Sequence, residues 1–562
     1  MSQRPRILLT SVARPFGRRH GDAFSTTTQA LHQLMWAQDI FRIEDPAYHW
    51  GLDVIAANIS APTVVLHYPS LRELARELRK GYDYIGISFN PPTFHKLKRM
   101  IPVIRKHAPQ TKIVLGGHGT ALRDDELEGY YDLLCREEGI QYFRKLLGEP
   151  DQPFRTPPFV FKSQLFSLPL LGKTAPIFGG VGCTNGCDFC MTSHYFNKRH
   201  TRFLQSGEDV LRAILEVKRH DPEVESFVVY DEDLLLNQKR GREFLEACRA
   251  TDERFTISVF ASVKALSQYE PTELAEMGVN SAWIGFEGMQ AGYAKQEGKP
   301  YEQLFRELKD VGISPAASMI IGYDYQTLEV IEREYAELLR IKPDICQFLI
   351  YGPTRNTPLF HKLDEEGRLD EIAYHLYPMM DGFTMGFAHP NISAPTMKMM
   401  ARQLYRGEYH HLGPSVFRVM ETALRGYRHL KGVDRPRLRI RAAMQKEFLV
   451  NGFAAQNIGQ AFAPNNLVRA RLAYLFEDLE REFGPAPPLQ KLQSYAVLPF
   501  GLLTRLKFKY HLLEQSPPRR HEYNMPDGRH VGATVSRRVR SLAGHLGRAA
   551  ERLPRIPSDI AN

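Results

Sequence analysis

Three cysteines lie close together in the chain, at Cys183, Cys187 and Cys190. Their C-x3-C-x2-C spacing, with an aromatic residue just before the last cysteine, belongs to the run Gly182-Cys183-Thr184-Asn185-Gly186-Cys187-Asp188-Phe189-Cys190. Cysteine thiolates are the usual ligands of iron–sulfur clusters, and three of them can bind three irons of a [4Fe–4S] cluster. The fourth iron is then left open for a small molecule. The spacing therefore predicts a redox cluster with one exchangeable position.

Zinc or purely structural cysteines are the alternative interpretation. A structural zinc site usually needs four ligands, commonly arranged as two separated pairs. The remaining cysteines, Cys135, Cys248 and Cys346, each stand alone in an apolar stretch, where a free cysteine behaves as a small buried hydrophobe. Disulfides are not expected, because six cysteines in 562 residues are sparse and no signal peptide opens the chain.

The cysteine run, with its aromatic residue, resembles the signature of the radical S-adenosylmethionine (radical SAM) superfamily. The resemblance implies that SAM chelates the open iron through its amino and carboxylate groups. It further implies that an electron from the cluster cleaves SAM to methionine and a 5′-deoxyadenosyl radical. That radical abstracts hydrogen from an unactivated carbon.

The segment that contains and follows the cysteines alternates apolar, β-rich runs with amphipathic helical patterns. Such alternation indicates parallel strands with helices outside them. Six units of this kind suit the partial (β/α)6 barrel that the radical SAM resemblance implies, and chemistry in parallel barrels gathers at the carboxyl ends of the strands. The expected strands are Pro176–Gly180, Ser226–Tyr230, Phe255–Phe260, Ala282–Phe286, Ala317–Ile321 and Gln347–Tyr351.

Residues just past these strands are candidate SAM contacts. The resemblance places Asp231 and Asp233 where the superfamily contacts the amino group of SAM, and a charge-assisted hydrogen bond would suit that role. The alternative is an acidic helix start, which the helix dipole favours. Ser262 is a candidate for ribose or carboxylate, Glu287 belongs to a Gly-x-Glu motif, and Gly322 ends the strand that flanks adenine in the superfamily.

A second α/β pattern precedes the barrel and predicts a doubly wound, Rossmann-like sheet. The ligand site of such a sheet lies beyond the carboxyl ends of its strands. The loops expected there contain Ser88 and the glycine-rich run Gly116-Gly117-His118. The expected strands are Arg6–Thr10, Thr63–Leu66, Tyr84–Ser88, Ile113–Gly116 and Leu133–Cys135, with helices at Ser70–Lys80 and Thr93–Lys106.

This segment resembles the cobalamin-binding domain of class B radical SAM enzymes, and the best matching runs contain Ser88 and Gly116, Gly117 and His118. The resemblance implies cobalamin bound by these loops. No D-x-H-x-x-G motif is present, so no lower axial histidine is expected from that device, and His118 is not assigned to cobalt. The alternative is a Rossmann-like domain that only packs on the barrel.

The boundaries expected are 1–155 for the cobalamin-binding-like domain, 170–364 for the barrel and 365–562 for a mostly α-helical region.

The composition, with 43% hydrophobic and 24% charged residues, is that of an ordinary soluble globular protein. No apolar run is long enough to span a bilayer. The C-terminal tail is basic, and an apolar helical face runs along it, so it is a candidate contact for a membrane surface. The positions on that face are Val535, Val539, Leu542, Leu546, Ala549 and Leu553. The alternative is a helix that docks on the protein and turns its charged face to solvent.

Taken together, these patterns predict a radical SAM enzyme that uses a [4Fe–4S] cluster, SAM and cobalamin to methylate an unactivated carbon of a small-molecule, hydrophobic or lipid-like substrate. Radical C–C bond formation or cyclisation without methyl transfer is one alternative, and a non-catalytic cobalamin or redox sensor is another. The expected partners are an electron donor such as flavodoxin or ferredoxin and a membrane surface at the tail, in a cytoplasmic protein. Nucleic acid is not expected, because no RNA-binding module is recognised.

Overall fold

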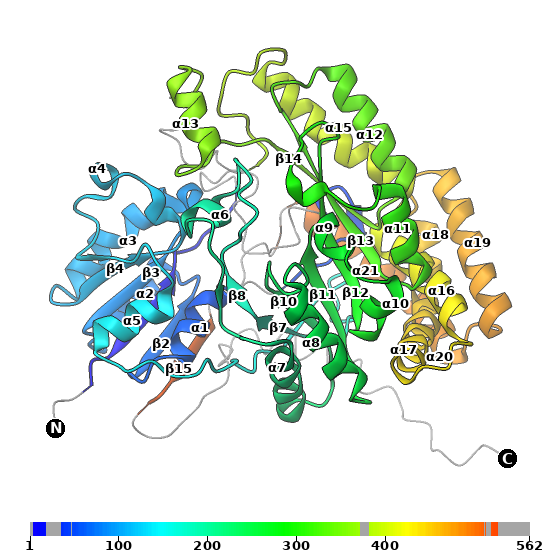
Figure 1. The fold of residues 1–562 in the computed structure, drawn as a ribbon, viewed down its shortest axis with the longest axis horizontal. Helices are drawn as coiled ribbons and strands as arrows, with labels where there is room; N and C mark the ends of the chain where they lie inside the picture. The colour runs from blue at the N-terminus through cyan, green and yellow to red at the C-terminus, as the bar shows by residue number, and fades with distance from the viewer. Residues whose placement is uncertain are drawn as a thin grey trace.

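The computed structural model describes residues 4–17, 35–45, 48–370, 382–510, 512 and 519–525. Two lobes stand side by side (Figure 1): an N-terminal α/β lobe, and a larger lobe in which C-terminal helices cover a second sheet. None of the helices in the described part of the chain is both long and apolar enough to cross a membrane. The apolar face expected at Val535–Leu553 lies outside the described residues.

The N-terminal sheet has the strand order β15-β2-β1-β3-β4-β5. Its first five strands in the chain are parallel, and the order reverses between β1 and β3, where a doubly wound sheet opens a crevice for ligands. The strands are β1 (Ile7–Ser11), β2 (Thr63–His67), β3 (Tyr84–Ser88), β4 (Lys112–Gly116) and β5 (Leu133–Leu134). The predicted doubly wound sheet is confirmed, and no strand end differs from its predicted position by more than one residue.

Helices cover both faces of this sheet, over two separate apolar clusters. Helix α2 begins where Ser70 and Glu73 form a capping box. The helices are α1 (Trp50–Ala57), α2 (Leu71–Leu78), α3 (Phe94–His107), α4 (Asp124–Leu127) and α5 (Gly139–Leu147), with 3-10 turns η3 (Asp39–Phe41), η4 (Pro91–Thr93) and η5 (His118–Ala121).

The second sheet has the order β14-β13-β12-β11-β10-β7-β6, and its six long strands are parallel. All six strands that the sequence predicts are present, and the short β6 pairs with β7 antiparallel at the edge. This is the predicted partial barrel. The strands are β6 (Phe161–Lys162), β7 (Lys173–Phe178), β10 (Val224–Tyr230), β11 (Thr256–Ala261), β12 (Val279–Glu287), β13 (Ser314–Ile321) and β14 (Ile345–Ile350).

The helices that follow the barrel strands pack outside the sheet and share its largest apolar cluster. They are α7 (Gly207–His220), α8 (Gln238–Arg249), α9 (Val263–Leu266), α10 (Pro271–Glu276), α11 (Tyr301–Asp310), α12 (Leu328–Ile341) and α13 (Pro358–Glu365), with η6 (Ala294–Gln296) between β12 and α11. The connection from β7 to α7 contains a small antiparallel pair, β8 (Gly180–Val181) and β9 (Thr201–Arg202), with α6 (Met191–Tyr195) between them.

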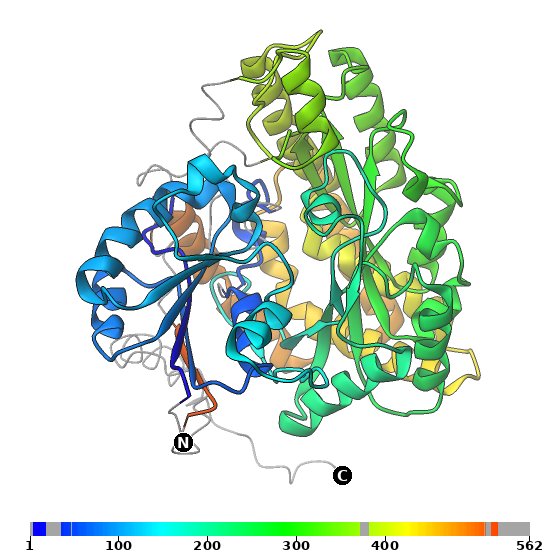
Figure 2. The ribbon, with the colours of Figure 1, turned by 60° about the vertical axis from the view of Figure 1, so that its left-hand side comes forward.

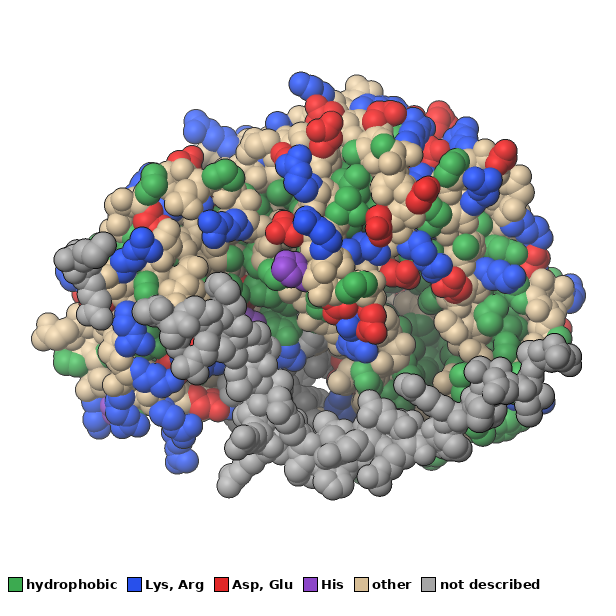
Figure 3. Space-filling model, turned by 90° about the horizontal axis from the view of Figure 1, so that it is seen from below, with side chains coloured by type: hydrophobic (Ala, Val, Ile, Leu, Met, Phe, Trp, Pro, Cys, Tyr) green, Lys and Arg blue, Asp and Glu red, His purple; other side chains and the backbone are tan. Residues whose placement is uncertain are grey.

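The C-terminal region is helical, as predicted, and packs against the barrel helices (Figure 2). Its core also takes in Ile40 and Phe41 from the N-terminal part of the chain. The helices are α15 (Ala394–Leu412), α16 (Ser415–Leu430), α17 (Pro436–Gly452), α18 (Gln456–Ala461), α19 (Asn466–Phe483), α20 (Pro488–Ala496) and α21 (Leu498–Lys509), with η8 (Phe453–Ala455). Seen from below (Figure 3), charged side chains of both signs are interspersed over the surface, with hydrophobic side chains visible between them.

One C-terminal segment was not predicted to be a strand. Strand β15 (Arg519–Tyr523) returns to the N-terminal lobe and pairs antiparallel with β2 at the sheet edge. Its central side chain, His521, is buried, and its Nδ1 lies 2.7 Å from Oδ1 of the buried Asp53. The polar sequence Arg-Arg-His-Glu-Tyr shows no apolar alternation, so this strand depends on its partner and not on local propensity.

Asp53, His67 and His521 form a buried group that could be taken for a metal site. Nε2 of His67 lies 2.8 Å from Oδ2 of Asp53, while Nδ1 of His67 accepts the backbone N–H of His49 at 3.1 Å. The Tyr523 hydroxyl, also on β15, donates to Oδ1 of Asp53 at 2.9 Å, so side chains of β15 already occupy this carboxylate oxygen. We therefore interpret the group as a hydrogen-bonded latch between β15 and the N-terminal lobe.

Candidate functional site

The three cysteines lie on the loop between β8 and α6, beyond the carboxyl end of β7. Cys183 and Cys187 are buried, Cys190 is half-buried, and all three thiols are free. Ser193 Oγ donates to the carbonyl oxygen of Cys183 at 2.8 Å and accepts the Gly186 N–H at 3.0 Å. The loop is thus shaped by its own hydrogen bonds, and its three thiols match the donor set of a [4Fe–4S] cluster with one open iron.

No fourth cysteine joins this loop in the described part of the chain. Cys135 follows β5 in the N-terminal lobe, Cys248 lies in α8, and Cys346 lies in β14. All three are buried, and burial raises the pKa of each thiol. Their separate positions argue against a four-cysteine zinc site and agree with the interpretation of these residues as small buried hydrophobes.

A glycine is required at the start of the cysteine loop. Gly182 has a φ of +92°, in the left-handed region that side chains rarely adopt. A Cβ atom there would lie 2.2 Å from the carbonyl oxygen of Arg199. A larger residue at position 182 would push the backbone at Arg199 away from the start of the cysteine loop.

Loops from distant barrel strands hold the middle of the cysteine run. The Tyr293 and Tyr351 hydroxyls each donate to the carboxylate of Asp188 at 2.5 Å. The Phe189 ring meets both tyrosine rings edge to face, with centroids 5.6 and 5.9 Å apart. Because Tyr293 follows β12 and Tyr351 follows β14, the far side of the barrel fixes the position of the loop.

A buried ion pair stands beside the thiols. Glu287, at the end of β12, is buried and pairs with Lys295. The Lys295 ammonium lies 5.5 Å from the centroid of the Phe189 ring. Burial alone would lower the pKa of Lys295, but Glu287 and Cys187 raise it on balance, so this lysine stays positively charged next to the cysteine loop.

The surroundings of Cys183 and Cys187 disfavour the thiolate form of these two cysteines. Burial raises the pKa of Cys183, and it raises the pKa of Cys187 to about 11. Iron binds the thiolate, so loading this site releases protons. A net positive group nearby, such as Lys295, favours the thiolate form.

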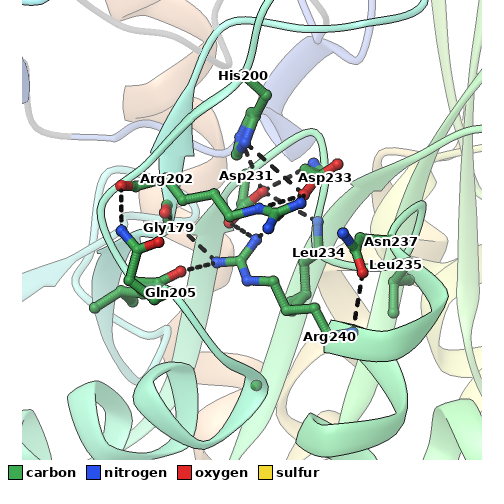
Figure 4. A network of polar contacts seen from close by, with 12 residues as sticks. Gly179, His200, Arg202, Gln205, Asp231, Asp233, Leu234, Leu235, Asn237 and Arg240 are labelled. Atoms are coloured by element: carbon green, nitrogen blue, oxygen red, sulfur yellow. Dashed lines mark hydrogen bonds and ion pairs between the residues drawn. The ribbon is translucent and has the colours of Figure 1, made fainter.

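The two aspartates predicted to contact SAM lie in a network of arginines (Figure 4). Arg240, which is fully buried, reaches Asp231 Oδ2 with its guanidinium at 2.7 Å, and Arg202 donates to Asp233 Oδ2 at 2.9 Å. His200 Nε2 lies 3.3 Å from Asp231 Oδ1. The structure brings both aspartates together, but it gives their carboxylates to protein partners. Their contact with SAM stays a prediction.

Glu232, between the two aspartates, faces the other way. Its side chain is solvent-accessible, and it lies near enough to Cys183 and Lys295 to interact with them electrostatically. Protein atoms packed around its carboxyl group partly desolvate it and so raise its pKa. Along a strand, successive side chains point to opposite faces, and that alternation carries past the end of β10 here. Glu232 is therefore the carboxylate of this run that adjoins the cysteine loop.

Ser262 follows β11 and Gly322 follows β13, two barrel strands with β12 between them, and both residues have local structural partners. Ser262 Oγ accepts the Ala265 N–H at 3.1 Å and caps α9. Gly322 has a φ of +100°, and its N–H donates to Gln326 Oε1 at 2.6 Å. Roles for these residues in SAM binding remain predictions.

The loops predicted to bind cobalamin come together at the carboxyl edge of the N-terminal sheet. Ser88 ends β3 and Gly116 ends β4, and the two are paired in register. Gly117 has a φ of +81°, and a Cβ there would lie 2.6 Å from Ser88 Oγ. The ring of His118 stands edge-on to Tyr195, with centroids 5.2 Å apart. The glycine is thus needed for the close approach of the two loops.

Helix α6 connects the cysteine loop to this edge. The Tyr195 hydroxyl lies 2.6 Å from Thr120 Oγ1 and donates to the carbonyl oxygens of Gly117 and Cys135 at 3.3 Å each. Tyr195 is buried, and it stands five positions after Cys190. The cysteine loop, which is predicted to bind the cluster, therefore faces the carboxyl edge of the N-terminal sheet, which is predicted to bind cobalamin.

Sequence reasoning missed several residues of this site. Lys295 lies in η6, in a segment without a recognisable motif, and Tyr293 directly precedes that turn. Tyr351 was expected only as the last residue of a strand. Glu232 could have been chosen over its neighbours from strand alternation. Tyr195 could not have been paired with Thr120, because that contact depends on how the lobes pack.

The family comparison agrees with this geometry. Residues 177–338 match the model of the radical SAM superfamily. This part of the chain is a radical SAM domain. It spans the cysteine loop and five of the six long barrel strands in whole or in part, β7 and β10 to β13.

Two curated relatives resemble the chain at low identity. An anaerobic magnesium-protoporphyrin IX monomethyl ester cyclase of Rubrivivax gelatinosus is 23% identical, over 55% of this chain and 63% of the relative. A bacteriochlorophyllide d C-8(2)-methyltransferase of Chlorobaculum tepidum is 23% identical, over 35% of this chain and 46% of the relative. The chain thus matches less than two thirds of the length of either relative.

A solved structure resembles the radical SAM domain together with its flanking regions. The radical SAM methyltransferase TsrM of Kitasatospora setae, with cobalamin and a [4Fe–4S] cluster bound, is 13% identical and superposes with a TM-score of 0.52. The match covers 79% of this chain and 99% of TsrM. At this identity the likeness shows a shared fold, which extends well beyond the radical SAM domain.

Proposed function

We propose that this protein is a cobalamin-dependent radical SAM methyltransferase that acts on an unactivated carbon of a hydrophobic or lipid-like small molecule. The observation that carries the proposal is the pairing of two edges through Tyr195: the cysteine loop on one side and the glycine-rich loop of a doubly wound sheet on the other. The methyltransferase relative and the fold shared with TsrM support it.

In this proposal Cys183, Cys187 and Cys190 hold a [4Fe–4S] cluster, and Ser88, Gly116, Gly117 and His118 line the cobalamin site. When bound, the cluster would supply reductive cleavage of SAM to methionine and a 5′-deoxyadenosyl radical, which abstracts hydrogen from the substrate. Cobalamin would supply the methyl group, and a second SAM would methylate the cobalamin again. An electron donor such as flavodoxin or ferredoxin supplies the reducing electrons.

The chain's own residues position these groups. Asp188, clamped by Tyr293 and Tyr351, fixes the cysteine loop against the far barrel strands. Lys295 offers a buried positive charge beside the thiolates, and Glu232 and Glu287 offer carboxylates to the ammonium of SAM. Asp231 and Asp233 orient that segment through Arg240 and Arg202.

Radical ring formation or C–C coupling is the second candidate, and the cyclase relative is the observation that favours it. Both candidates share the cluster and SAM. They differ in whether a methyl group is transferred, so bound corrinoid and labelled methyl groups distinguish them.

The test is anaerobic reconstitution with iron, sulfide and cobalamin, followed by desalting and reduction in the presence of SAM and a hydrophobic cell extract. The proposal predicts retained corrinoid, 5′-deoxyadenosine, and methyl label from SAM in an extract component, all lost in a C183A/C187A/C190A variant except the corrinoid. Deoxyadenosine without corrinoid would favour coupling or cyclisation. Absence of deoxyadenosine from a cluster-loaded protein would contradict both candidates.

A further inference from the structure

Helix α21 presents its large apolar residues to solvent and buries its small ones. Gly501 and Thr504 are its buried residues, and a Cβ on Gly501 would touch the ring of Phe462 at 2.9 Å. On the opposite side, Leu502 and Leu503 are 58% and 59% exposed, and Leu506 is also exposed. An ordinary surface helix has the reverse arrangement, with its apolar stripe facing the core.

The preceding helix, α20, shows the same inversion. Its buried residue is Ser494, whose Oγ accepts a hydrogen bond from Asn457 Nδ2 at 2.9 Å. Leu489, Leu492 and Tyr495 are exposed. Both helices pack on α18 with their small residues, so their leucine-rich sides face outward together. Tyr510 and Leu512 extend the exposed apolar set beyond α21.

This apolar face carries positive charge and no negative charge. Residues 483–513 contain four basic residues and no aspartate or glutamate. Lys491 and Lys509 are exposed beside the leucines. Arg505 and Lys507 turn toward the body of the protein, where they pair with Asp39 and Glu44 and fasten α21 in place. An exposed apolar patch of this kind marks an interaction site.

We propose that α20 and α21 form a docking face for an anionic phospholipid surface. Leucines and tyrosines on an amphipathic helix enter the interface between headgroups and acyl chains, while flanking lysines bind anionic headgroups. The charge pattern favours a phospholipid surface over two other partners, the C-terminal tail of the same chain and a second copy of the protein. Residues 526–562 carry seven arginines against three acids, so they would be repelled by this face, and a second copy of the face would bring like charges together.

The inner side of the docking face contacts an N-terminal segment, residues 39–45, that continues to the edge of the barrel. The 3-10 turn at Asp39–Phe41 packs against α21, and a few residues on, Asp45 accepts a hydrogen bond from Ser163 at 2.6 Å, next to β6 at the barrel edge. Docking at α20 and α21 would place the larger lobe on the membrane. The inference rests on surface residues alone, so it can fail while the proposed chemistry holds, and the reverse.

The test uses the full-length protein without added cofactors and sedimentation with phosphatidylcholine vesicles that contain, or lack, about 30% phosphatidylglycerol. We expect binding to the anionic vesicles only, and at least about tenfold weaker binding for L502E/L506E. The matched control is L467E/Y474E on α19, where the two side chains are 67% and 61% exposed and so more exposed than Leu502 and Leu506. It should bind like wild type, and all variants should keep the wild-type melting temperature.

Three results would overturn the proposal. The first is wild-type protein that stays in the supernatant with anionic vesicles. The second is an L502E/L506E variant that sediments as well as wild type, or a loss of binding confined to an R537Q/R538Q/R540Q variant, which would assign the contact to the tail. The third is a wild-type dimer that L502E/L506E converts to a monomer, which would assign the face to a second copy.

Discussion

The Tyr195 hydroxyl lies 2.6 Å from Thr120 Oγ1, and this buried contact joins the helix that follows the cluster cysteines to the loop that ends strand β4 of the other lobe. Replacing Tyr195 by Phe removes the hydroxyl and keeps the ring that packs on His118. Thr120 retains its bond to the Gly117 carbonyl at 2.8 Å, so the cost should be that of one buried hydrogen bond, about 1 kcal/mol.

For Y195F we therefore expect a melting temperature a few degrees below wild type, unchanged iron content and weaker corrinoid retention. Differential scanning fluorimetry and the ratio of corrinoid to protein after desalting measure these. Retention equal to that of wild type would show that the contact does not shape the loop at Gly117.

Arg240 is predicted to be the main stabilising residue of the network in Figure 4. Arg240→Met would leave the buried Asp231 without its closest cation, and breaking a buried pair in this way costs about 3–5 kcal/mol. The matched control is its neighbour Lys239→Met, whose side chain is 88% exposed and whose change should cost less than about 0.5 kcal/mol. Thermal unfolding of the two variants decides between a structural network and a dispensable one, and equal melting temperatures would contradict the assignment.

Lys295 is predicted to tune the cluster. Replacing it by Met removes a positive charge beside Cys187 and Cys190, which makes adding an electron to the cluster harder. We expect a more negative reduction potential in an EPR-monitored titration, a near-normal value for Lys295→Arg, and no change for Lys264→Met, which pairs with Glu297 at the surface. If all of these proteins have the same reduction potential, the charge of Lys295 does not act on the cluster.

Asp53 gives the latch of strand β15 a defined pH dependence. Burial alone would raise the pKa of Asp53, but His67 and His521 lower it to about 2. Because the folded-state pKa lies below the unfolded value of 3.8, the carboxylate contributes stability above about pH 4, and that contribution is lost as the pH falls toward 2. The shift corresponds to about 2 kcal/mol.

Asp53→Asn should therefore be less stable than wild type at pH 7, and the gap in melting temperature should narrow between about pH 4 and pH 2. Limited proteolysis at pH 7 should also release the C-terminal segment sooner in Asp53→Asn. A gap that stays constant with pH would mean that the stabilisation does not come from the ionised carboxylate.

The parallel strands of both sheets could be predicted because their signal is local. β13 is buried throughout and mostly apolar, and the capping box at Ser70 marks the start of α2 in four residues. β15 could not be predicted, because Arg519–Tyr523 is a strand only where β2 offers an edge. The exposure of the leucines of α21 could not be predicted either, because the sequence shows which residues are apolar but not which side of the helix packs on the core.

The candidate site divides in the same way. Cys183, Cys187 and Cys190 were predictable because cluster ligands follow a fixed spacing along the chain. Asp231 and Asp233 were chosen as ligand contacts from their position after a strand, and only the fold shows that Arg240 and Arg202 reach their carboxylates. Lys295 and Tyr195 act through contacts between distant segments, which no local pattern encodes.

The most direct test of the central claim is EPR spectroscopy of the reduced, anaerobically reconstituted protein with and without SAM. A site of three cysteines with one open iron predicts about four irons per chain, a [4Fe–4S]⁺ signal whose shape changes when SAM is added, and no such signal in Cys187→Ala. A protein that binds no iron–sulfur cluster, or one whose cluster signal is unaffected by SAM, would contradict the account.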